Sequence, residues 1–179
     1  MILTGEKVTL RPLLPQDAAA IVSYASDPRL RELVDGSYPS SMAECSPWLS
    51  SLKSDRNHKH FAIVAPDGRF IGDIELDSIS WRRREGELRI CICDPDYWNR
   101  GLGTDAVATL AVYAFTQLNL RLIYLRVYTD NHRAIRCYEK VGFRTVGWLR
   151  RPSKQGMREI YLMSLTPEQF LLPLPALAG

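Results

Sequence analysis

The sequence predicts one mixed α/β sheet with helices on both of its faces. Three observations lead to this prediction: short apolar runs typical of strands, apolar residues at the spacing of one helix face, and turn residues between these segments. No internal repeat and no linker divides the chain, so we expect a single domain over residues 1–179.

Short apolar runs bounded by turn residues predict the strands. Pro66, Asp67 and Gly68 separate two of these runs and have the composition of a hairpin turn. A polar loop, Arg151 to Gly156, would join the last two. The predicted strands are Val8 to Leu10, Phe61 to Val64, Phe70 to Leu76, Glu87 to Cys93, Leu122 to Val127, Thr145 to Leu149 and Arg158 to Ser164.

Apolar residues three and four apart predict the helices. Two of them, Asp17 to Tyr24 and Ser41 to Leu52, are separated by Asp27-Pro28 and Ser37-Tyr38-Pro39. A third covers Thr104 to Asn119. The fourth, Asn131 to Val141, has an Asn at its start and Gly142 at its end.

The composition limits the possible function. The chain is 46% hydrophobic and 24% charged, which suits one globular domain with a sizeable core. A net charge of +3 is too small to indicate a nucleic-acid partner. The sequence has neither a charged-then-apolar leader nor a long apolar run, so we expect a soluble cytoplasmic protein without a membrane partner.

A glycine-rich turn follows the strand that ends at Cys93. Gly101 and Gly103 lie where a helix begins, so unpaired backbone N–H groups point outward at this turn. Such groups, with the positive end of the helix dipole behind them, bind phosphate oxygens, and glycine lets a ligand approach closely. The turn therefore predicts a phosphate or pyrophosphate site.

Other interpretations of this turn must be compared. Residues 101–106 also satisfy the dinucleotide fingerprint G-x-G-x-x-A, with Asp130 as the ribose-binding acid. Against this, Asp94 to Arg100 separate the strand from the first glycine, and no further strand–helix alternation follows. A nucleoside triphosphate loop is excluded because no Gly-Lys-Ser or Gly-Lys-Thr occurs. A turn that only caps a helix stays possible.

A second block, residues 128–143, decides between these interpretations. It has the pattern N-x-x-A-x-x-x-Y-x-x-x-G-F, from Asn131 through Ala134 and Tyr138 to Phe143, and follows the turn R-G-L-G-T that begins at Arg100. Together they resemble the GNAT N-acetyltransferase superfamily, particularly its RimJ/RimL-like and polyamine acetyltransferase branches. The resemblance covers about residues 7–165 and leaves 166–179 as a C-terminal tail. It implies a mostly antiparallel, twisted sheet of about six to seven strands.

The resemblance also implies site residues and a co-substrate, acetyl-CoA. Residues Cys91 to Cys93 would pair through their backbones with the pantetheine arm, and Tyr138 would protonate the departing thiolate. Trp98 departs from the family pattern, which usually has Gln or Arg there. The residues implied to contact the cofactor are Cys91, Ile92, Cys93, Arg100, Gly101, Leu102, Gly103, Thr104, Asn131 and Ala134.

A general base can be sought among the strand carboxylates. Asp73 and Glu75 share one strand face, and Glu87 lies on the next strand. If the hairpin between them centres near Trp81, Glu75 and Glu87 become neighbours, and their mutual repulsion raises the pKa of one toward that of a useful base. The alternative is that nearby arginines such as Arg89 pair with these carboxylates.

The cysteines and histidines predict neither a metal site nor a covalent intermediate. Cys91 and Cys93 share a strand face, but His132 is far from them, and zinc sites need clustered ligands. His58, His60 and His132 form no nucleophile pattern with Ser or Cys. We therefore expect direct attack of a neutral amine on acetyl-CoA.

The acceptor stays open at this stage. Asp73, Glu75 and Asp77 could hold a polyamine, a protein N-terminus or an aminoglycoside, together with Glu32, Asp35 and Glu44. A non-catalytic acyl-CoA binding or sensing module is the main alternative, and a dinucleotide-dependent oxidoreductase is a weaker one. An open sheet edge and the apolar tail from Phe170 to Gly179 favour a homodimer.

Overall fold

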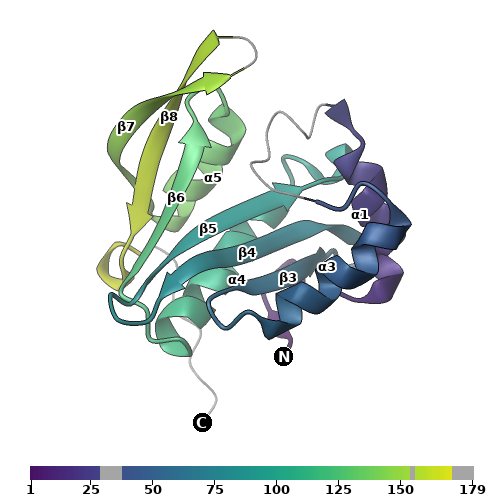
Figure 1. Ribbon diagram of the computed structural model, residues 1–179. Coiled ribbons are helices and arrows are strands. Elements are labelled where there is room, and N and C mark those ends of the chain that lie inside the picture. Colours follow the sequence, from purple (N-terminus) through teal and green to yellow (C-terminus); the bar gives the residue numbers. More distant parts are fainter. Residues whose placement is uncertain (29–37, 154–155, 171–179) are drawn as a thin grey trace.

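A computed structural model describes residues 1–28, 38–153 and 156–170. Within these ranges eight strands form one sheet in the order β1-β2-β3-β4-β5-β6-β8-β7 (Figure 1). The strands are β1 (Leu3–Thr4), β2 (Thr9–Pro12), β3 (Lys59–Val64), β4 (Phe70–Ser80), β5 (Glu85–Ile92), β6 (Leu122–Tyr128), β7 (Arg144–Ser153) and β8 (Gly156–Leu165).

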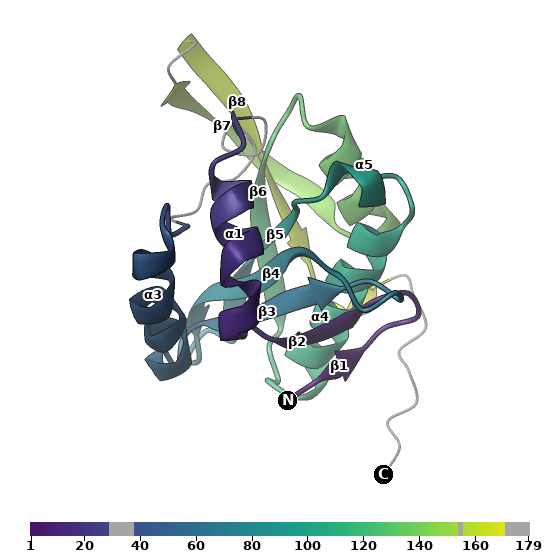
Figure 2. The same ribbon diagram turned by 90° about the vertical axis from the view of Figure 1, so that its right-hand side faces the viewer.

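Four α-helices of the described chain cover the two faces of this sheet (Figure 2). They are α1 (Ala18–Ala25), α3 (Met42–Ser54), α4 (Leu102–Thr116) and α5 (His132–Val141). Alternation along β3 separates two cores: Ala62 packs with α1 and α3, whereas Phe61 and Ile63 belong to the larger cluster that includes α4 and α5. Short 3₁₀ turns occupy Pro15–Asp17, Pro95–Tyr97 and Pro167–Gln169.

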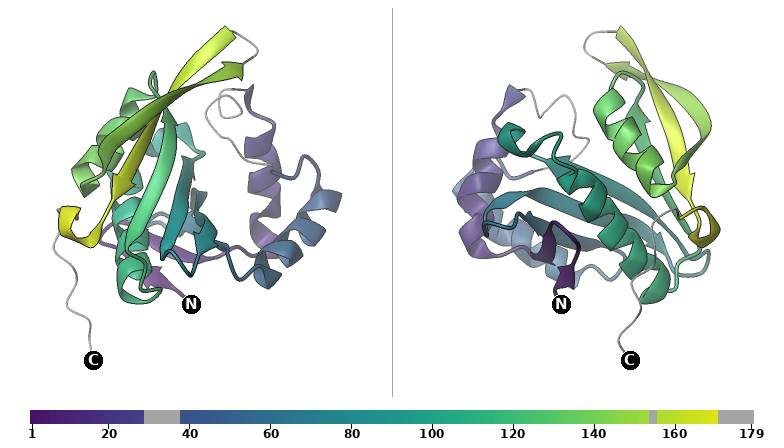
Figure 3. Two further views of the ribbon diagram at one scale, coloured as in Figure 1. Left: turned by 60° about the vertical axis from the view of Figure 1, so that its left-hand side comes forward. Right: turned by 180° about the vertical axis from the view of Figure 1, so that it is seen from behind.

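The middle of the sheet is split. β5 and β6 are parallel and pair only from Glu85–Leu122 to Glu87–Tyr124, whereas all other neighbouring strands are antiparallel. Beyond Glu87 the two strands diverge, so the sheet opens like a V between a β1–β5 arm and a β6–β8–β7 arm (Figures 1 and 3). Beyond this point β5 and β6 do not pair with each other in the part of the chain that the structure describes.

The predicted fold class is confirmed, with differences at the ends of elements. β1 is an additional two-residue strand that pairs with β2, which is why the sheet exceeds the expected six to seven strands. The expected polar loop 151–156 is wrong at both ends, because β7 continues to Ser153 and β8 begins at Gly156. Helix α4 begins at Leu102 rather than Thr104. No helix of the described residues is long and apolar enough to cross a membrane.

Asp105, in the first turn of α4, ties the first hairpin to the glycine turn. Its carboxylate accepts hydrogen bonds from the backbone N–H groups of Glu6 (3.1 Å), Lys7 (2.7 Å) and Val8 (2.9 Å). The approach is so close that a Cβ on Gly5 would lie 2.4 Å from an Asp105 oxygen. These contacts hold the Lys7 side chain beside Gly101.

Candidate functional site

A cavity of about 540 Å³ fills the opening of the V. Residues of β3, β4, β5, β6, α4 and α5 line it, as do the turn before α4 and the segment before α5. Among the residues predicted from the sequence, the lining includes Glu75, Glu87, Cys91, Ile92, Gly101, Leu102, Gly103, Thr104, Asn131, Ala134 and Tyr138. The structure therefore brings the two sequence motifs and both candidate carboxylates to one cavity, while Cys93 and Arg100 lie outside its lining.

The glycine turn forms one end of the cavity. Gly101 has φ +79°, a left-handed conformation that a side chain would strain, and it immediately precedes the first helical residue, Leu102. A Cβ on Gly103 would meet Ile92 and Cys137 only at 3.6 and 3.7 Å, so the protein itself leaves room there. Lys7 Nζ lies 3.0 Å from the position of a Cβ on Gly101. The Lys7 ammonium group thus adds a positive charge beside the N–H groups at the start of α4. The sequence did not predict this contribution, because Lys7 and Gly101 are far apart in the chain.

The backbone of β5 offers the cavity less than the sequence predicted. The Cys93 N–H donates to Ile71 O at 2.8 Å, so this group is already used on the β4 side. Backbone groups alternate in direction along a strand, which turns those of Ile92 toward β6. Ile92 O accepts a hydrogen bond from the Trp98 indole at 2.7 Å. The Cys93 N–H is therefore already used within the sheet, and Ile92 is the residue whose backbone faces the V.

Trp98 has a structural reason for replacing the family's usual polar residue. Besides its bond to Ile92, its ring lies under the Arg133 guanidinium, 3.5 Å from the ring centroid. The Arg100 guanidinium lies 5.2 Å from the centroid of the Tyr97 ring, in the turn just before Gly101. These stacked contacts fix two cations beside the glycine turn.

Helix α5 supplies the second motif. The Asn131 side chain accepts a hydrogen bond from the Ala134 N–H at 3.2 Å, which caps the helix. Tyr138, two turns further on, is buried and lines the cavity. Burial, with smaller contributions from Cys137 and Cys91, raises the pKa of its phenol well above the ordinary value. The hydroxyl therefore keeps its proton at neutral pH and can donate it.

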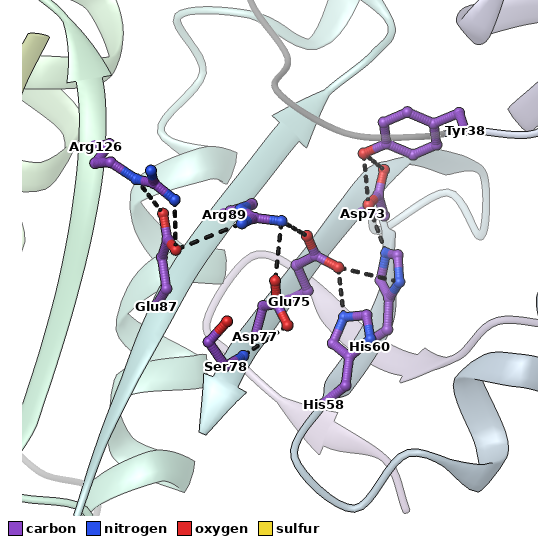
Figure 4. Close-up of polar contacts among 10 residues, drawn as sticks. All are labelled: Tyr38, His58, His60, Asp73, Glu75, Asp77, Ser78, Glu87, Arg89 and Arg126. Atoms are coloured by element: carbon purple, nitrogen blue, oxygen red, sulfur yellow. Dashed lines mark hydrogen bonds and ion pairs between the residues drawn. The ribbon is translucent and has the colours of Figure 1, made fainter. Parts of the chain in front are cut away.

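The other end of the cavity holds a network of charged side chains (Figure 4). Glu87 is buried and accepts two bonds from Arg126, at 2.8 and 2.9 Å. Arg89 contacts Glu87 at 3.4 Å, Glu75 at 3.5 Å and Asp77 at 3.0 Å. The arginines thus separate the carboxylates that the sequence had placed side by side.

The hairpin register explains why the predicted carboxylate pair does not form. Glu75 lies opposite Arg89, and Glu87 lies opposite Asp77, so the hairpin centres on Arg82 instead of Trp81. A bulge between Asp77 and Ser80, with Ser78 at φ +52°, shifts the register between the turn and these pairs. Burial opposes the charge of Glu75, but the His58 hydrogen bond and the charges of His60 and Arg89 outweigh it and lower the pKa. The expected upward shift by mutual repulsion is wrong for Glu75.

Two histidines complete the network, and the sequence argument did not find them. His58 Nε2 donates to Glu75 at 2.5 Å, and His60 Nε2 donates to Asp73 at 2.6 Å. The Tyr38 hydroxyl also donates to Asp73, at 2.9 Å. Burial disfavours the His60 cation, yet the hydrogen bond to Asp73 and the charges of Asp73, Glu75 and Asp77 raise its pKa. The sequence signal is the pattern His-x-His, which directs His58 and His60 to one side of the chain, and in the register His60 lies opposite Glu75.

The remaining predicted acidic residues contribute less. Glu44 accepts bonds from the Ser40 N–H (2.8 Å) and hydroxyl (3.0 Å) at the start of α3 and does not line the cavity. Glu32 and Asp35 lie outside the described residues. The Cys91 and Cys93 thiols are buried 2.9 Å apart.

Comparison with known proteins gives consistent matches over most of the chain. The family described as Acetyltransferase (GNAT) domain matches residues 7–144. Spermidine N(1)-acetyltransferase of Escherichia coli strain K12 is 31% identical over 146 residues, which are 82% of this chain and 77% of that protein. Among solved structures, the spermidine N-acetyltransferase of Vibrio cholerae in complex with CoA and spermine has a TM-score of 0.82 at 24% identity, covering 92% of this chain and 98% of that one. RimJ of Mycobacterium smegmatis in complex with CoA-disulfide has a TM-score of 0.81 at 22% identity, with coverage of 93% and 85%.

Proposed function

Because the chain belongs to the GNAT acetyltransferase family, whose members use acetyl-CoA, we propose that it acetylates a primary amine of a linear polyamine directly. The observation that carries the proposal is the cluster of carboxylates at one end of a cavity whose other end is a phosphate-binding turn. A cofactor with several phosphates and a polycationic acceptor require such opposite ends.

In this proposal the cofactor lies along the V. The N–H groups at the start of α4, together with Lys7 and Arg100, hold the pyrophosphate. The Ile92 backbone pairs with the pantetheine arm, and Asn131 and Ala134 flank it. The thioester then lies between β5 and α5, within reach of Tyr138.

The chemistry needs a proton acceptor and a proton donor. The neutral amine attacks the thioester carbonyl, and a backbone N–H of β5 stabilises the oxyanion. The nitrogen becomes acidic as the C–N bond forms, so even a carboxylate with a lowered pKa can take its proton. Glu75 suits this role better than Glu87, because Arg126 holds both oxygens of Glu87. Tyr138 protonates the CoA thiolate as it leaves.

Charge favours a polyamine over a simple amine. Asp73, Glu75, Asp77 and Glu87 supply four carboxylates, against two guanidinium groups from Arg89 and Arg126. The two guanidinium charges balance only half of these four carboxylate charges. An extended polyamine can place one amine at the thioester and its remaining ammonium groups on this network. The E. coli relative, a spermidine N(1)-acetyltransferase, has an acceptor of this class.

The test is CoA thiol release with acetyl-CoA and a panel of acceptors. Spermidine and spermine should react, butylamine should react at least about tenfold more slowly in kcat/KM, and a peptide N-terminus should react poorly. A peptide that reacts fastest would contradict the polyamine assignment. Binding of acetyl-CoA without release with any amine would instead favour a sensing role.

We also propose that the protein forms a homodimer or a larger assembly. Val146 and Trp148 on the edge strand β7, and Met157 on β8, are exposed to 65%, 63% and 61%. Apolar side chains on a sheet edge favour contact with another copy. One Vibrio cholerae neighbour with a TM-score of 0.77 is described as dodecameric. Light scattering after size exclusion measures the mass.

A further inference from the structure

Three side chains with metal-binding atoms converge at the acceptor end of the cavity. His58 precedes β3, His60 lies two residues further along the same face, and Glu75 of β4 is the register partner of His60. One potential ligand atom from each lies within 4.8 Å of the others. Figure 4 shows both imidazole rings directed at the Glu75 carboxylate.

An unsatisfied buried nitrogen points into this group. His60 is 5% exposed in its side chain, and its Nδ1 has no hydrogen-bond partner among the described residues. The nearest carboxylate oxygen, Glu75 Oε2, lies 3.4 Å away. Two ligand atoms bound at about 2.1 Å to a tetrahedral zinc ion are about 3.4 Å apart, so the spacing suits a shared ion. A buried nitrogen without a partner otherwise costs free energy.

The opposite nitrogen of His60 is held in the manner of a metal ligand. Its Nε2 donates to Asp73 at 2.6 Å, and Asp73 also accepts from the Tyr38 hydroxyl at 2.9 Å. A metal-bound histidine nearly always donates its second ring N–H to a carboxylate, which fixes the tautomer that leaves the other nitrogen free to coordinate. Here that other nitrogen is Nδ1, the atom without a partner.

The donor set selects the kind of ion. Two imidazole nitrogens and one carboxylate oxygen suit Zn²⁺ and the neighbouring divalent transition metals, whereas Mg²⁺ and Ca²⁺ prefer oxygen ligands. All three residues line the cavity, so a fourth coordination position would face its interior.

We propose that His58, His60 and Glu75 form a Zn²⁺ site at the acceptor end of the cavity. The ion replaces the proton between His58 and Glu75, and their 2.5 Å contact opens as both atoms coordinate. Zn²⁺ brings two positive charges to the network, so it competes with a polycationic acceptor. This competition rests on the proposed function, whereas zinc binding itself does not.

Calorimetric titration of the metal-free full chain with ZnCl₂ tests the site. One ion per chain should bind, MgCl₂ should give no comparable heat, and His58→Gln and His60→Gln should each weaken zinc binding at least tenfold. The exposed His132 gives the matched control, because His132→Gln should leave zinc binding unchanged. Equal zinc affinity in wild type and in both histidine variants overturns the proposal.

Three further measurements test the same assignment. Co²⁺ bound at this site should give the visible absorption bands of an ion with a low coordination number and with nitrogen and oxygen ligands. Added Zn²⁺ should displace the Co²⁺ and abolish these bands. Loss of metal binding in Cys91→Ser or Cys93→Ser, with retention in His58→Gln, would move the site to the thiols and contradict the assignment. Zinc should lower kcat/KM for spermidine in wild type, because it occupies both the acidic network and the proposed base Glu75, and should not do so in His58→Gln. If spermidine is not acetylated in the absence of zinc, that result counts against the proposed acceptor. The zinc-binding titration still decides whether the metal site exists.

Discussion

The two ends of the cavity are built in different ways. At the proposed cofactor end, backbone groups at a helix start and along the β5 edge face the cavity, and the proposal requires few side chains. At the acceptor end, side chains of β3, β4, β5 and β6 hold one another through ion pairs, and almost no backbone group takes part. The first end should respond to atoms added between its backbone and the bound cofactor, whereas the second should respond to changes of charge.

The largest effect, on kcat, is expected from replacing Tyr138. Tyr138→Phe removes the proposed proton donor and should lower kcat by about 100-fold, the lower limit usual for general acid catalysis. Acetyl-CoA affinity should change little, because the phenyl ring still fills its place. Tyr113→Phe is the matched control, since Tyr113 is also buried but lies outside the cavity lining. Full turnover of Tyr138→Phe across the pH range would remove the acid role.

The ion pairs of the acceptor end should contribute to the free energy of unfolding. Glu87→Gln leaves Arg126 and Arg89 without their buried carboxylate. Because Arg126 is 44% exposed, water partly compensates, and we expect a loss of about 2 kcal/mol in the free energy of unfolding rather than the larger cost of a fully buried pair. Urea denaturation measures it. An unchanged midpoint would show that the network contributes little to folding.

The glycine turn should respond to a single methyl group. Gly103→Ala should fold normally, because its Cβ would be in ordinary contact with Ile92 and Cys137, but it should weaken acetyl-CoA binding about tenfold by obstructing the phosphates. Gly147→Ala, which also has room for a Cβ, should bind acetyl-CoA as wild type does. Calorimetry compares the two variants. Equal affinities would mean that no ligand approaches Gly103 closely.

The smallest effect is expected from pH. As pH rises through the raised pKa of His60, the ring loses its proton and the charges of Asp73 and Glu75 are less compensated. A polyamine stays protonated, since alkyl amines have pKa values near 10. The KM for spermidine should therefore fall a few-fold between about pH 6 and pH 8, and this dependence should be weaker in His60→Gln. A KM that rises over the same interval contradicts this sign.

The contrast between the two ends also explains what the sequence could predict. The helix starts at Gly101 and Asn131 and the strand leading into the turn depend on neighbouring residues, so local patterns were enough to predict the fold class and to propose a cofactor site at this turn. The family match to residues 7–144 confirms that interpretation and makes the dinucleotide alternative wrong. The position of Lys7 could not be foreseen, because Asp105, 98 residues away, determines it.

At the acceptor end the arrangement depends on strand register. The register of the β4–β5 hairpin decides whether Glu75 faces Glu87 or Arg89, and no local pattern specified that register or the bulge that shifts it. His58 and His60 had no assigned role in the sequence because their partners come from a different strand. Carboxylate residues could be listed from the sequence, but their pairing and the direction of their pKa shifts required the structure.

The central claim is that the acidic network selects a polyamine, and one ratio tests it most directly. We would measure kcat/KM for spermidine divided by kcat/KM for butylamine, in wild type and in Asp77→Asn, which leaves the proposed base in place. The account predicts a ratio of at least about ten that falls several-fold in the variant, with unchanged acetyl-CoA affinity. A wild-type ratio near one, or a ratio that Asp77→Asn leaves unchanged, would contradict it.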